Sequence, residues 1–254
     1  MIFIDKLSFT YPGTDWASLH NVSLQIADGE TVSIMGANGS GKTTLARCLN
    51  GLLLPTSGRV MVNQLRTDLE SDNEQIRQLV GMVFQNPDNQ IVSTSVEREI
   101  AFGLENLNVP HEHMIKTVDN LLAEFNLERY RKRSPHYLSG GEKQLLALAA
   151  VLAMTPAFLI LDEPTSLLDP FSRQQILQAI FRNGNSGLAQ VTPILITQYP
   201  EETFFTERLI VLDQGQVVFD DSPRQVFDQV EELNRIGIGV PVEYQLRLGS
   251  EDEN

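Results

Sequence analysis

The sequence predicts an α/β fold with a mostly parallel sheet, an antiparallel N-terminal part and a helical insert. Three observations lead to this prediction. Short apolar runs bounded by turn residues alternate along the chain with segments of helical periodicity. One run, Phe158–Leu161, is apolar throughout, as central parallel strands are. The segment Met114–Phe125 carries apolar residues at helical spacing, which is typical of an amphipathic helix.

The N-terminal part of the chain is predicted to contain several strands and two helices. Turn-forming residues separate the first three apolar runs, and Pro55 follows a helix in which Leu45, Leu49 and Leu52 share one face. The predicted elements are strands over Ile2–Leu7, Val22–Ile26 and Thr31–Met35, a helix over Thr43–Leu53, a strand over Arg59–Val62, a short helix that begins at Asp72–Gln75, and a strand over Val80–Phe84.

The C-terminal part continues the alternation of strands and helices. The apolar stretch after Gly141 is too continuous for a surface helix, so we expect it to be buried. Further elements are predicted at Ile194–Thr197, Leu209–Leu212 and Val217–Phe219 as strands, and near Gln225–Leu233 as a short helix. The tail turns polar from Asp220 and ends in Ser250–Asn254, which we expect to fray.

Composition limits the kind of protein this can be. The chain has 254 residues, with 19 Lys and Arg against 33 Asp and Glu, which gives a formal net charge of −14. Hydrophobic residues make up 42% and charged residues 20%, as in an ordinary globular protein of one large domain or slightly more. The acidic balance argues against a protein that binds nucleic acid or anionic lipid through its overall charge.

Cysteine usage and apolar stretches indicate a soluble, cytoplasmic protein. Cys48 is the single cysteine, which excludes an intramolecular disulfide and a multi-cysteine metal site. The longest apolar stretch, Leu145–Met154, falls short of the about 20 residues that a spanning helix needs. Met1–Asp5 has neither the basic flank nor the apolar run of a signal peptide.

The segment Gly36–Thr43 fits the pattern G-x-x-x-x-G-K-[ST], between a predicted strand and a predicted helix. Its glycines let the backbone curl so that successive N–H groups point inward, and the helix presents its positive end to phosphates. Lys42 would reach the β- and γ-phosphates, and the Thr43 hydroxyl would bind Mg²⁺. The alternative, a Gly- and Ser-rich turn before a helix, does not account for the full pattern.

Two adjacent carboxylates follow the apolar run Phe158–Leu161. Asp162 would emerge at the carboxyl end of a parallel strand, where open α/β sheets bind ligands, and would hold Mg²⁺. Glu163 would polarise an attacking water. The alternative is a solvated strand end, but the phosphate loop favours the magnesium interpretation.

The segment Leu138–Gln144 lies one helix before that strand. Ser139, Gly140 and Gly141 at a helix start offer a hydroxyl, room for close approach and N–H groups for a second anion, although Ser-Gly-Gly alone usually marks a helix cap. Together with the two motifs above, this segment makes the chain resemble the nucleotide-binding subunit of ATP-binding-cassette (ABC) transporters. The resemblance extends over about residues 1–219.

The resemblance implies an architecture and an assembly. The fold would be a P-loop NTPase (RecA-like) core with an N-terminal antiparallel β subdomain, within residues 1–219, and a helical insert over about 86–150 that carries the signature motif. Two chains would close head to tail around ATP and Mg²⁺, and each signature motif would meet the ATP bound by the other chain. The C-terminal extension, 220–254, would take part in dimer contact.

The resemblance also implies roles for single residues. Tyr11, otherwise a turn residue before Pro-Gly, would stack on adenine, and Ser166 and Asp169 would lie in a loop that crosses the dimer interface. The implied ATP-binding residues are Tyr11, Gly36, Asn38, Gly39, Ser40, Gly41, Lys42, Thr43 and Thr44; the catalytic residues are Glu163, Gln85 and Gln198; the Mg²⁺ ligands are Thr43, Gln85 and Asp162; and the residues at the partner's ATP are Ser139, Gly140, Gly141 and Gln144.

Three further segments are similar to the ATPase components of energy-coupling-factor (ECF) transporters, which import vitamins or cobalt and nickel ions. They are Val83–Gln90, Ile100–Leu107 and Ile236–Pro241. For the first of these the alternative is a polar loop, because Asn-Pro-Asp-Asn forms turns in any protein. The resemblance implies an ATPase that works with a second ATPase chain, beneath a membrane coupling protein and a separate substrate-binding membrane component, at the cytoplasmic face of the membrane.

One position departs from the ABC pattern. Gln198 stands where the family places a histidine that contacts the γ-phosphate. Glutamine donates a hydrogen bond but carries no positive charge, so a nucleotide-binding half with weakened hydrolysis is a second interpretation. The motifs are also compatible with an ordinary ABC importer subunit and with a soluble ABC ATPase that acts on DNA or ribosomes. The soluble class usually has coiled-coil inserts or two cassettes, which this sequence lacks.

Overall fold

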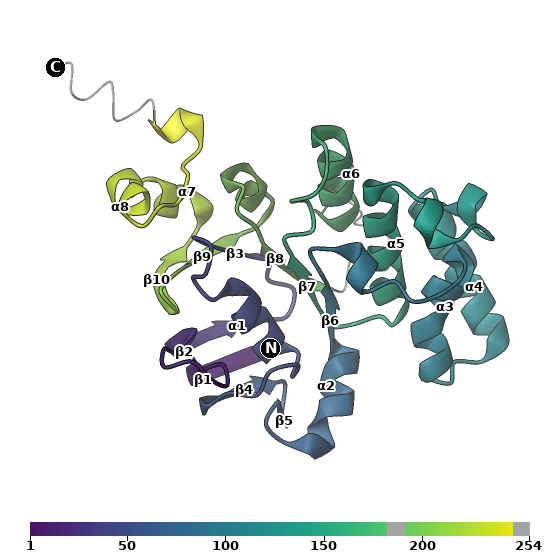
Figure 1. The fold of residues 1–254 in the computed structure, drawn as a ribbon, viewed down its shortest axis with the longest axis horizontal. Helices are drawn as coiled ribbons and strands as arrows, with labels where there is room; N and C mark the ends of the chain where they lie inside the picture. The colour runs from purple at the N-terminus through teal and green to yellow at the C-terminus, as the bar shows by residue number, and fades with distance from the viewer. Residues whose placement is uncertain (182–190, 246–254) are drawn as a thin grey trace. The chain divides into compact units, whose positions relative to one another are not determined.

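The structure, a computed structural model, describes residues 1–181 and 191–245. The chain forms two compact units, and Figure 1 shows their elements. Unit 1 comprises Met1–Arg77 and the chain from Thr192 onward, and unit 2 comprises Gln78–Val191. Unit 1 is therefore built from both ends of the chain, and the predicted helical insert falls within unit 2. The tail Ser250–Asn254, predicted to fray, lies outside the described residues.

An antiparallel sheet forms the first layer of unit 1. Its strands lie in the order β2-β1-β4-β5: β2 (Leu19–Ile26), β1 (Ile2–Phe9), β4 (Ser57–Val62) and β5 (Leu65–Arg66). In β1 the buried positions change phase, from Ile2 and Ile4 to Leu7 and Phe9. The register shifts between Ile4 and Leu7, where Lys6 has a φ of 49°. This irregularity keeps all four apolar side chains on the buried face, because an unshifted strand would turn the last two outward.

A second sheet supports the phosphate loop in unit 1. Its strands lie in the order β10-β9-β3-β8: β10 (Gln216–Asp221), β9 (Arg208–Asp213), β3 (Val32–Gly36) and β8 (Thr192–Ile196). Strand β3 pairs in parallel with both β8 and β9, and β10 pairs antiparallel with β9. All residues of β3 and β8 are buried, which agrees with their apolar runs. Helix α1 (Lys42–Leu49) follows β3, and α2 (Asn73–Leu79), after a 3₁₀ turn at Glu70–Asp72, leads into unit 2.

The described part of the C-terminal extension belongs to the core of unit 1. Helices α7 (Pro223–Phe227) and α8 (Val230–Arg235) replace the single predicted helix, because Gln229 adopts a non-helical backbone between them. Phe227, Leu233 and Tyr244 are buried in one cluster with side chains of β9. The ring of Phe204, in the 3₁₀ helix Pro200–Phe205, stacks on Tyr244 with centroids 6.3 Å apart.

Unit 2 combines a parallel strand pair with helices. The pair is β6 (Val80–Val83) and β7 (Phe158–Asp162), buried along its whole length. The helices are α3 (Val96–Asn106), α4 (His111–Glu124), α5 (Gly140–Ala153) and α6 (Pro170–Phe181), with 3₁₀ turns at Pro87–Asn89, Glu128–Tyr130 and Pro135–Tyr137. Helix α5 packs against α3, α4 and α6. The predicted burial of the stretch after Gly141 is thus confirmed.

Several predictions about the helices were wrong or incomplete. Helix α1 ends at Leu49 because the Asn50 side-chain oxygen accepts a hydrogen bond from the Leu52 N–H (3.1 Å) and Gly51 has a φ of 71°. Leu52 is consequently 45% exposed and does not share the buried face. Ile115 is likewise 45% exposed, so it does not belong to the buried stripe of α4. Helices α3 and α6 were not among the predicted elements; in α6 the buried positions are confined to a short stripe near its end.

Candidate functional site

The phosphate loop joins β3 to α1 in unit 1. Gly39 and Gly41 have φ values of 82° and 105°, which L residues with a Cβ rarely adopt. Gly41, at the N-cap of α1, makes no side-chain cap hydrogen bond to the helix. A helix N-terminus that directly follows such a loop is an arrangement that binds anions.

Three glycines are packed too closely for any other residue. A Cβ on Gly36 would lie 2.3 Å from the Leu212 carbonyl oxygen, and a Cβ on Gly41 would lie 2.6 Å from the Ser18 carbonyl oxygen. Gly215, in the β9–β10 turn, donates its N–H to the Ser40 carbonyl (3.0 Å) and also abuts Ser18. Sequence reasoning missed Ser18 and Gly215, because only the fold brings them to the loop. Ser18 and Gly215 both contact the phosphate loop and so restrict its conformation.

Lys42 lies over the loop and is 6% exposed. Its Nζ donates to the carbonyls of Gly36 (2.8 Å) and Ala37 (3.1 Å). The Ser40 Oγ is buried and has no hydrogen-bond partner within the described chain. A bound ligand could supply the missing hydrogen bond, since buried polar atoms are usually paired. The remaining loop residues predicted to bind ATP are near the surface: Asn38 and Gly39 are exposed, and Thr43 is half-buried.

Tyr11 is attached to this loop through Thr44. The Tyr11 hydroxyl and the Thr44 Oγ1 lie 3.1 Å apart, and the Tyr11 ring packs edge-on against Phe9 with centroids 4.8 Å apart. Tyr11 is half-buried. The structure therefore brings Tyr11 and Thr44 together with the phosphate loop in unit 1.

The carboxylates lie in unit 2, where three predicted residues from separate motifs meet. Gln85 donates from Nε2 to the Glu163 carboxylate (2.9 Å) and to the Ser166 Oγ (3.2 Å). The Ser166 hydroxyl in turn donates to the Glu163 carbonyl (3.1 Å). Glu163 has a φ of 48°, which turns the chain sharply after β7, while Asp162 at the strand end is 5% exposed. The strand end thus carries one buried and one more accessible carboxylate.

The chain around Gln85 is held by Gln90, the last residue of the segment Val83–Gln90, for which the sequence indicated no structural role. The Gln90 Oε1 accepts from the Phe84 N–H (3.1 Å), and its Nε2 donates to the Met82 carbonyl (3.3 Å). Asn86 accepts from the Asp88 N–H (3.0 Å) and so caps the 3₁₀ turn that follows. The polar segment after β6 is therefore an ordered loop that fixes the position of Gln85.

The loop after Glu163 ends in a helix cap. The Asp169 carboxylate accepts from the N–H groups of Phe171 (3.0 Å) and Ser172 (3.1 Å) and from the Ser172 hydroxyl (2.6 Å). The bonds from Ser172 lower the pKa of Asp169 below its ordinary value. Asp169 thus caps the start of α6. The same bonds fix the backbone at the end of the loop that is predicted to cross the dimer interface.

The signature segment begins α5. Ser139 and Glu142 form a capping box: the Ser139 Oγ accepts from the Glu142 N–H (3.3 Å), and the Glu142 carboxylate accepts from the Ser139 N–H (2.8 Å). Ser139 and Gly140 are exposed. Gln144 is 2% exposed and donates to the Phe84 carbonyl (3.4 Å), so the structure does not bring it to the surface beside them.

Gln198 follows β8 in unit 1 and is exposed. Its two neighbours in the chain are hydrogen-bonded: the Thr197 hydroxyl donates to the buried Glu202 carboxylate (2.6 Å) and accepts from the Tyr199 N–H (3.0 Å). These bonds fix the backbone on both sides of Gln198. The side chain is therefore presented at the carboxyl end of β8, in the unit that carries the phosphate loop.

The oxygen donors proposed for Mg²⁺ suit that ion. Thr43, Gln85 and Asp162 offer a hydroxyl, an amide oxygen and a carboxylate, and Mg²⁺ prefers oxygen ligands. Among the described residues no group of three or more His, Cys, Asp or Glu could hold a metal by itself. This donor set fits an ion that arrives with nucleotide phosphates, since Mg²⁺ is usually held by one or two carboxylates, waters and substrate oxygens.

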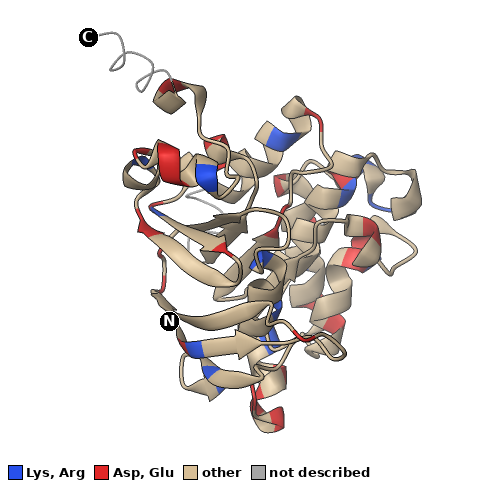
Figure 2. Ribbon diagram, turned by 60° about the vertical axis from the view of Figure 1, so that its left-hand side comes forward, with Lys and Arg blue, Asp and Glu red and all other residues tan. Residues whose placement is uncertain are grey.

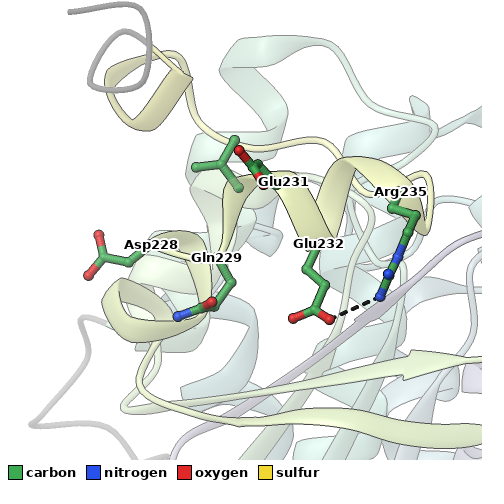
Figure 3. Close-up of a pocket in the computed structure, with 6 residues that line it drawn as sticks. Asp228, Gln229, Glu231, Glu232 and Arg235 are labelled. Carbon is green, nitrogen blue, oxygen red and sulfur yellow. Dashed lines mark hydrogen bonds and ion pairs between the residues drawn. The ribbon is translucent and has the colours of Figure 1, made fainter. Parts of the chain in front are cut away.

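Two hollows in the described chain differ in whether predicted site residues line them. One hollow, of about 480 Å³, lies at α8 and is lined by Asp228, Gln229, Val230, Glu231, Glu232 and Arg235. Glu232 and Arg235 are paired at 2.9 Å, and the dashed line in Figure 3 marks this pair. This hollow contains no predicted site residue. A hollow of about 600 Å³ in unit 2 is lined in part by Ser139 and Gly141 of the signature segment. Acidic residues are spread over helices and loops of both units (Figure 2).

Within residues 1–181 and 191–245, no helix is long and apolar enough to cross a bilayer. The family model described as "ABC transporter" matches residues 19–166. Two relatives named energy-coupling factor transporter ATP-binding protein EcfA1 align with nearly the whole chain. The one from Caldanaerobacter subterraneus subsp. tengcongensis is 44% identical, over 95% of this chain and 87% of that protein. The one from Bacillus subtilis is 43% identical, over 97% and 87%.

Two solved structures are also similar. The structure of cbiO1 from Clostridium perfringens, described as part of the ABC transporter complex cbiONQ, has a TM-score of 0.82 and 31% identity, and the match covers 97% of this chain and 98% of that one. The ATP-binding cassette MJ0796, a dimer in a post-hydrolysis state bound to ADP and Pi, has a TM-score of 0.79 and 29% identity, with coverage of 88% and 99%.

The packing of Gly36 generates a prediction. Gly36→Ala should weaken nucleotide binding by about tenfold or more, because the loop must move away from Leu212. It should also lower the free energy of unfolding by about 1–3 kcal/mol. The control is Gly239→Ala, whose Cβ would meet only Pro200 at 3.7 Å. Titration with a fluorescent ATP analogue checks this, and equal affinities of the two variants would contradict it.

Proposed function

The chain belongs to the ABC transporter family and, within it, to the energy-coupling factor ATP-binding proteins; from this premise we propose that it binds and hydrolyses ATP to energise an ECF-type importer of vitamins or of cobalt or nickel ions. The observation that carries the proposal is that Gln85, Glu163 and Ser166, residues of separate motifs, are joined by hydrogen bonds: Gln85 donates to the Glu163 carboxylate and to Ser166, and Ser166 donates to the Glu163 carbonyl. The likeness to cbiO1, described as part of a transporter complex, supports the same function.

ATP phosphates would bind to the phosphate loop through local groups. The N–H groups at the start of α1 and the Lys42 ammonium would surround the β- and γ-phosphates, for which Lys42 must exchange its bonds to the Gly36 and Ala37 carbonyls for phosphate oxygens. Tyr11, which is half-buried, would stack on the adenine ring. This binding needs no positive surface, so it is compatible with a net charge of −14.

Hydrolysis would depend on the carboxylates of unit 2 acting on the same nucleotide. Glu163 would accept a proton from the water that attacks the γ-phosphate, with Gln85 holding the carboxylate in position. Thr43, Gln85 and Asp162 would hold Mg²⁺, which when bound neutralises phosphate charge. The low exposure of Asp162 and the greater accessibility of Glu163 support this division of roles.

The assembly would contain two ATPase chains, alike or related. The dimeric structures of the similar cassette MJ0796 support a pair of chains. In such a pair Ser139, Gly140 and Gly141 of each chain would meet the ATP held by the other. Residues 1–219 would form the cassette and 220–254 would contribute to contact between the chains. A membrane coupling protein and a substrate-binding membrane component would complete the importer, with this subunit bound at the cytoplasmic face.

The role of Glu163 can be tested by Glu163→Gln. Turnover should fall by about 10²-fold or more, because the amide cannot accept the proton, whereas ATP affinity should stay within about twofold. Steady-state ATPase activity of the assembled transporter and ATP binding are the measurements. Glu112→Gln, at an exposed position of α4, is the matched control. Sustained turnover in Glu163→Gln would remove Glu163 as the base.

Gln198 supports a second candidate function, a nucleotide-binding half whose own hydrolysis is weak. Glutamine donates a hydrogen bond but brings no positive charge to the phosphate, so it stabilises the negative charge that develops in the transition state less than a protonated histidine would. Gln198→His should therefore raise the ATPase rate of the assembled transporter by about tenfold or more. Gln64→His, at an exposed turn position, is the control. An unchanged rate would mean that the substitution has no catalytic significance.

A further inference from the structure

The start of α5 is attached to a residue outside the signature segment. The Glu142 carboxylate that closes the capping box also accepts a hydrogen bond from the Tyr130 hydroxyl, and the Arg129 guanidinium lies 3.6 Å away. One oxygen of Glu142 therefore holds the Ser139 N–H while the other is held by Tyr130. Through this carboxylate the position of Tyr130 determines the position of Ser139.

Tyr130 is itself a firmly placed residue. The Arg129 guanidinium lies over its ring at 4.6 Å from the centroid, and that of Arg133 lies at 5.6 Å. The backbone that follows Tyr130 is bound to α3, because the Arg131 and Arg133 carbonyls accept the N–H groups of Glu97 (3.0 Å) and Val96 (3.1 Å). The Tyr130 hydroxyl is thus a fixed donor and not a flexible surface group.

The charge of Glu142 makes this contact consequential. Burial alone would raise the pKa of Glu142, but hydrogen bonds from Tyr130 and Ser139 hold it below its ordinary value, so the carboxylate is ionised at neutral pH. An ionised carboxylate in the first turn of α5 would repel a phosphate brought to Ser139 and Gly141 if it turned toward it. Its bonds to Tyr130 and Ser139 hold the negative charge within the helix cap.

We propose that Tyr130 is a positioning residue for the ATP of the partner chain: it holds Glu142 in the capping box and so presents Ser139, Gly140 and Gly141 to the γ-phosphate. The inference rests on the proposed function, in which the signature segment meets that nucleotide. The hollow of about 600 Å³ in unit 2 is lined by Tyr130, Ser139 and Glu142 together, so the contact borders an accessible face. Tyr130 acts through Glu142 and touches no nucleotide.

The test is Tyr130→Phe, which removes only the hydroxyl. In the assembled transporter the KM for ATP should rise about tenfold, because a charge-assisted hydrogen bond is lost, while kcat at saturating ATP changes less than twofold. Binding of a fluorescent ATP analogue to the isolated chain should not change, and its melting temperature should fall by only a few degrees, because a single hydrogen bond is lost. Tyr137→Phe, 72% exposed and beside the same Arg133, is the matched control and should leave KM unaltered.

A double-mutant cycle separates positioning from a structural role. Glu142→Gln keeps a side chain that closes a capping box but removes the charge, so Tyr130→Phe should change KM much less in that background. Equal effects in both backgrounds, or an unchanged KM in Tyr130→Phe alone, would overturn the inference. If the wild-type transporter itself shows no ATP turnover, the proposed function has failed and not merely this inference.

Discussion

The close packing of glycines around the phosphate loop is the constraint on which the site in unit 1 depends. Gly36 lies against the Leu212 carbonyl, and Gly41 and Gly215 both lie against Ser18. These contacts join the loop to β9, to the β9–β10 turn and to the start of β2, so the sheet and not the ligand determines its shape. A loop shaped in advance presents the N–H groups of α1 without a further ordering cost on binding. The site therefore binds anions by local geometry in a protein that is acidic overall.

In unit 2, hydrogen bonds from side chains fix the geometry at two turns of the chain. Glu163 stands at a sharp turn after β7, where Gln85 and Ser166 hold its carboxylate and its carbonyl. Ser139 stands at the start of α5, where Glu142 holds its N–H. In the first place a side chain from a separate segment fixes a group that the proposed reaction needs, and in the second Tyr130 does so through Glu142. The two arrangements also differ, because the first gathers predicted catalytic residues and the second depends on Tyr130, which no motif contains.

The sequence predicted the motifs and most strands because their determinants are local. The phosphate loop is defined by consecutive residues, and Phe158–Leu161 is apolar enough to require burial. Contacts between distant segments were not predictable: Gly215 and Ser18 reach the loop, and Gln90 holds Gln85, only after folding. The exposure of Ile115 and the burial of Gln144 were missed for a related reason, since periodicity and motif membership do not say which neighbour covers a helix face.

The central claim is that the signature segment of one chain completes the binding site of the ATP that the phosphate loop of another chain holds. The most direct measurement is a structure of the protein, with the ATPase chain that it associates with, in the presence of Mg²⁺ and a non-hydrolysable ATP analogue. We expect Ser139 and Gly141 of this chain to contact the γ-phosphate of a nucleotide held by the phosphate loop of the other chain. A nucleotide bound away from Lys42, or one that no second chain's signature segment reaches, would contradict the claim.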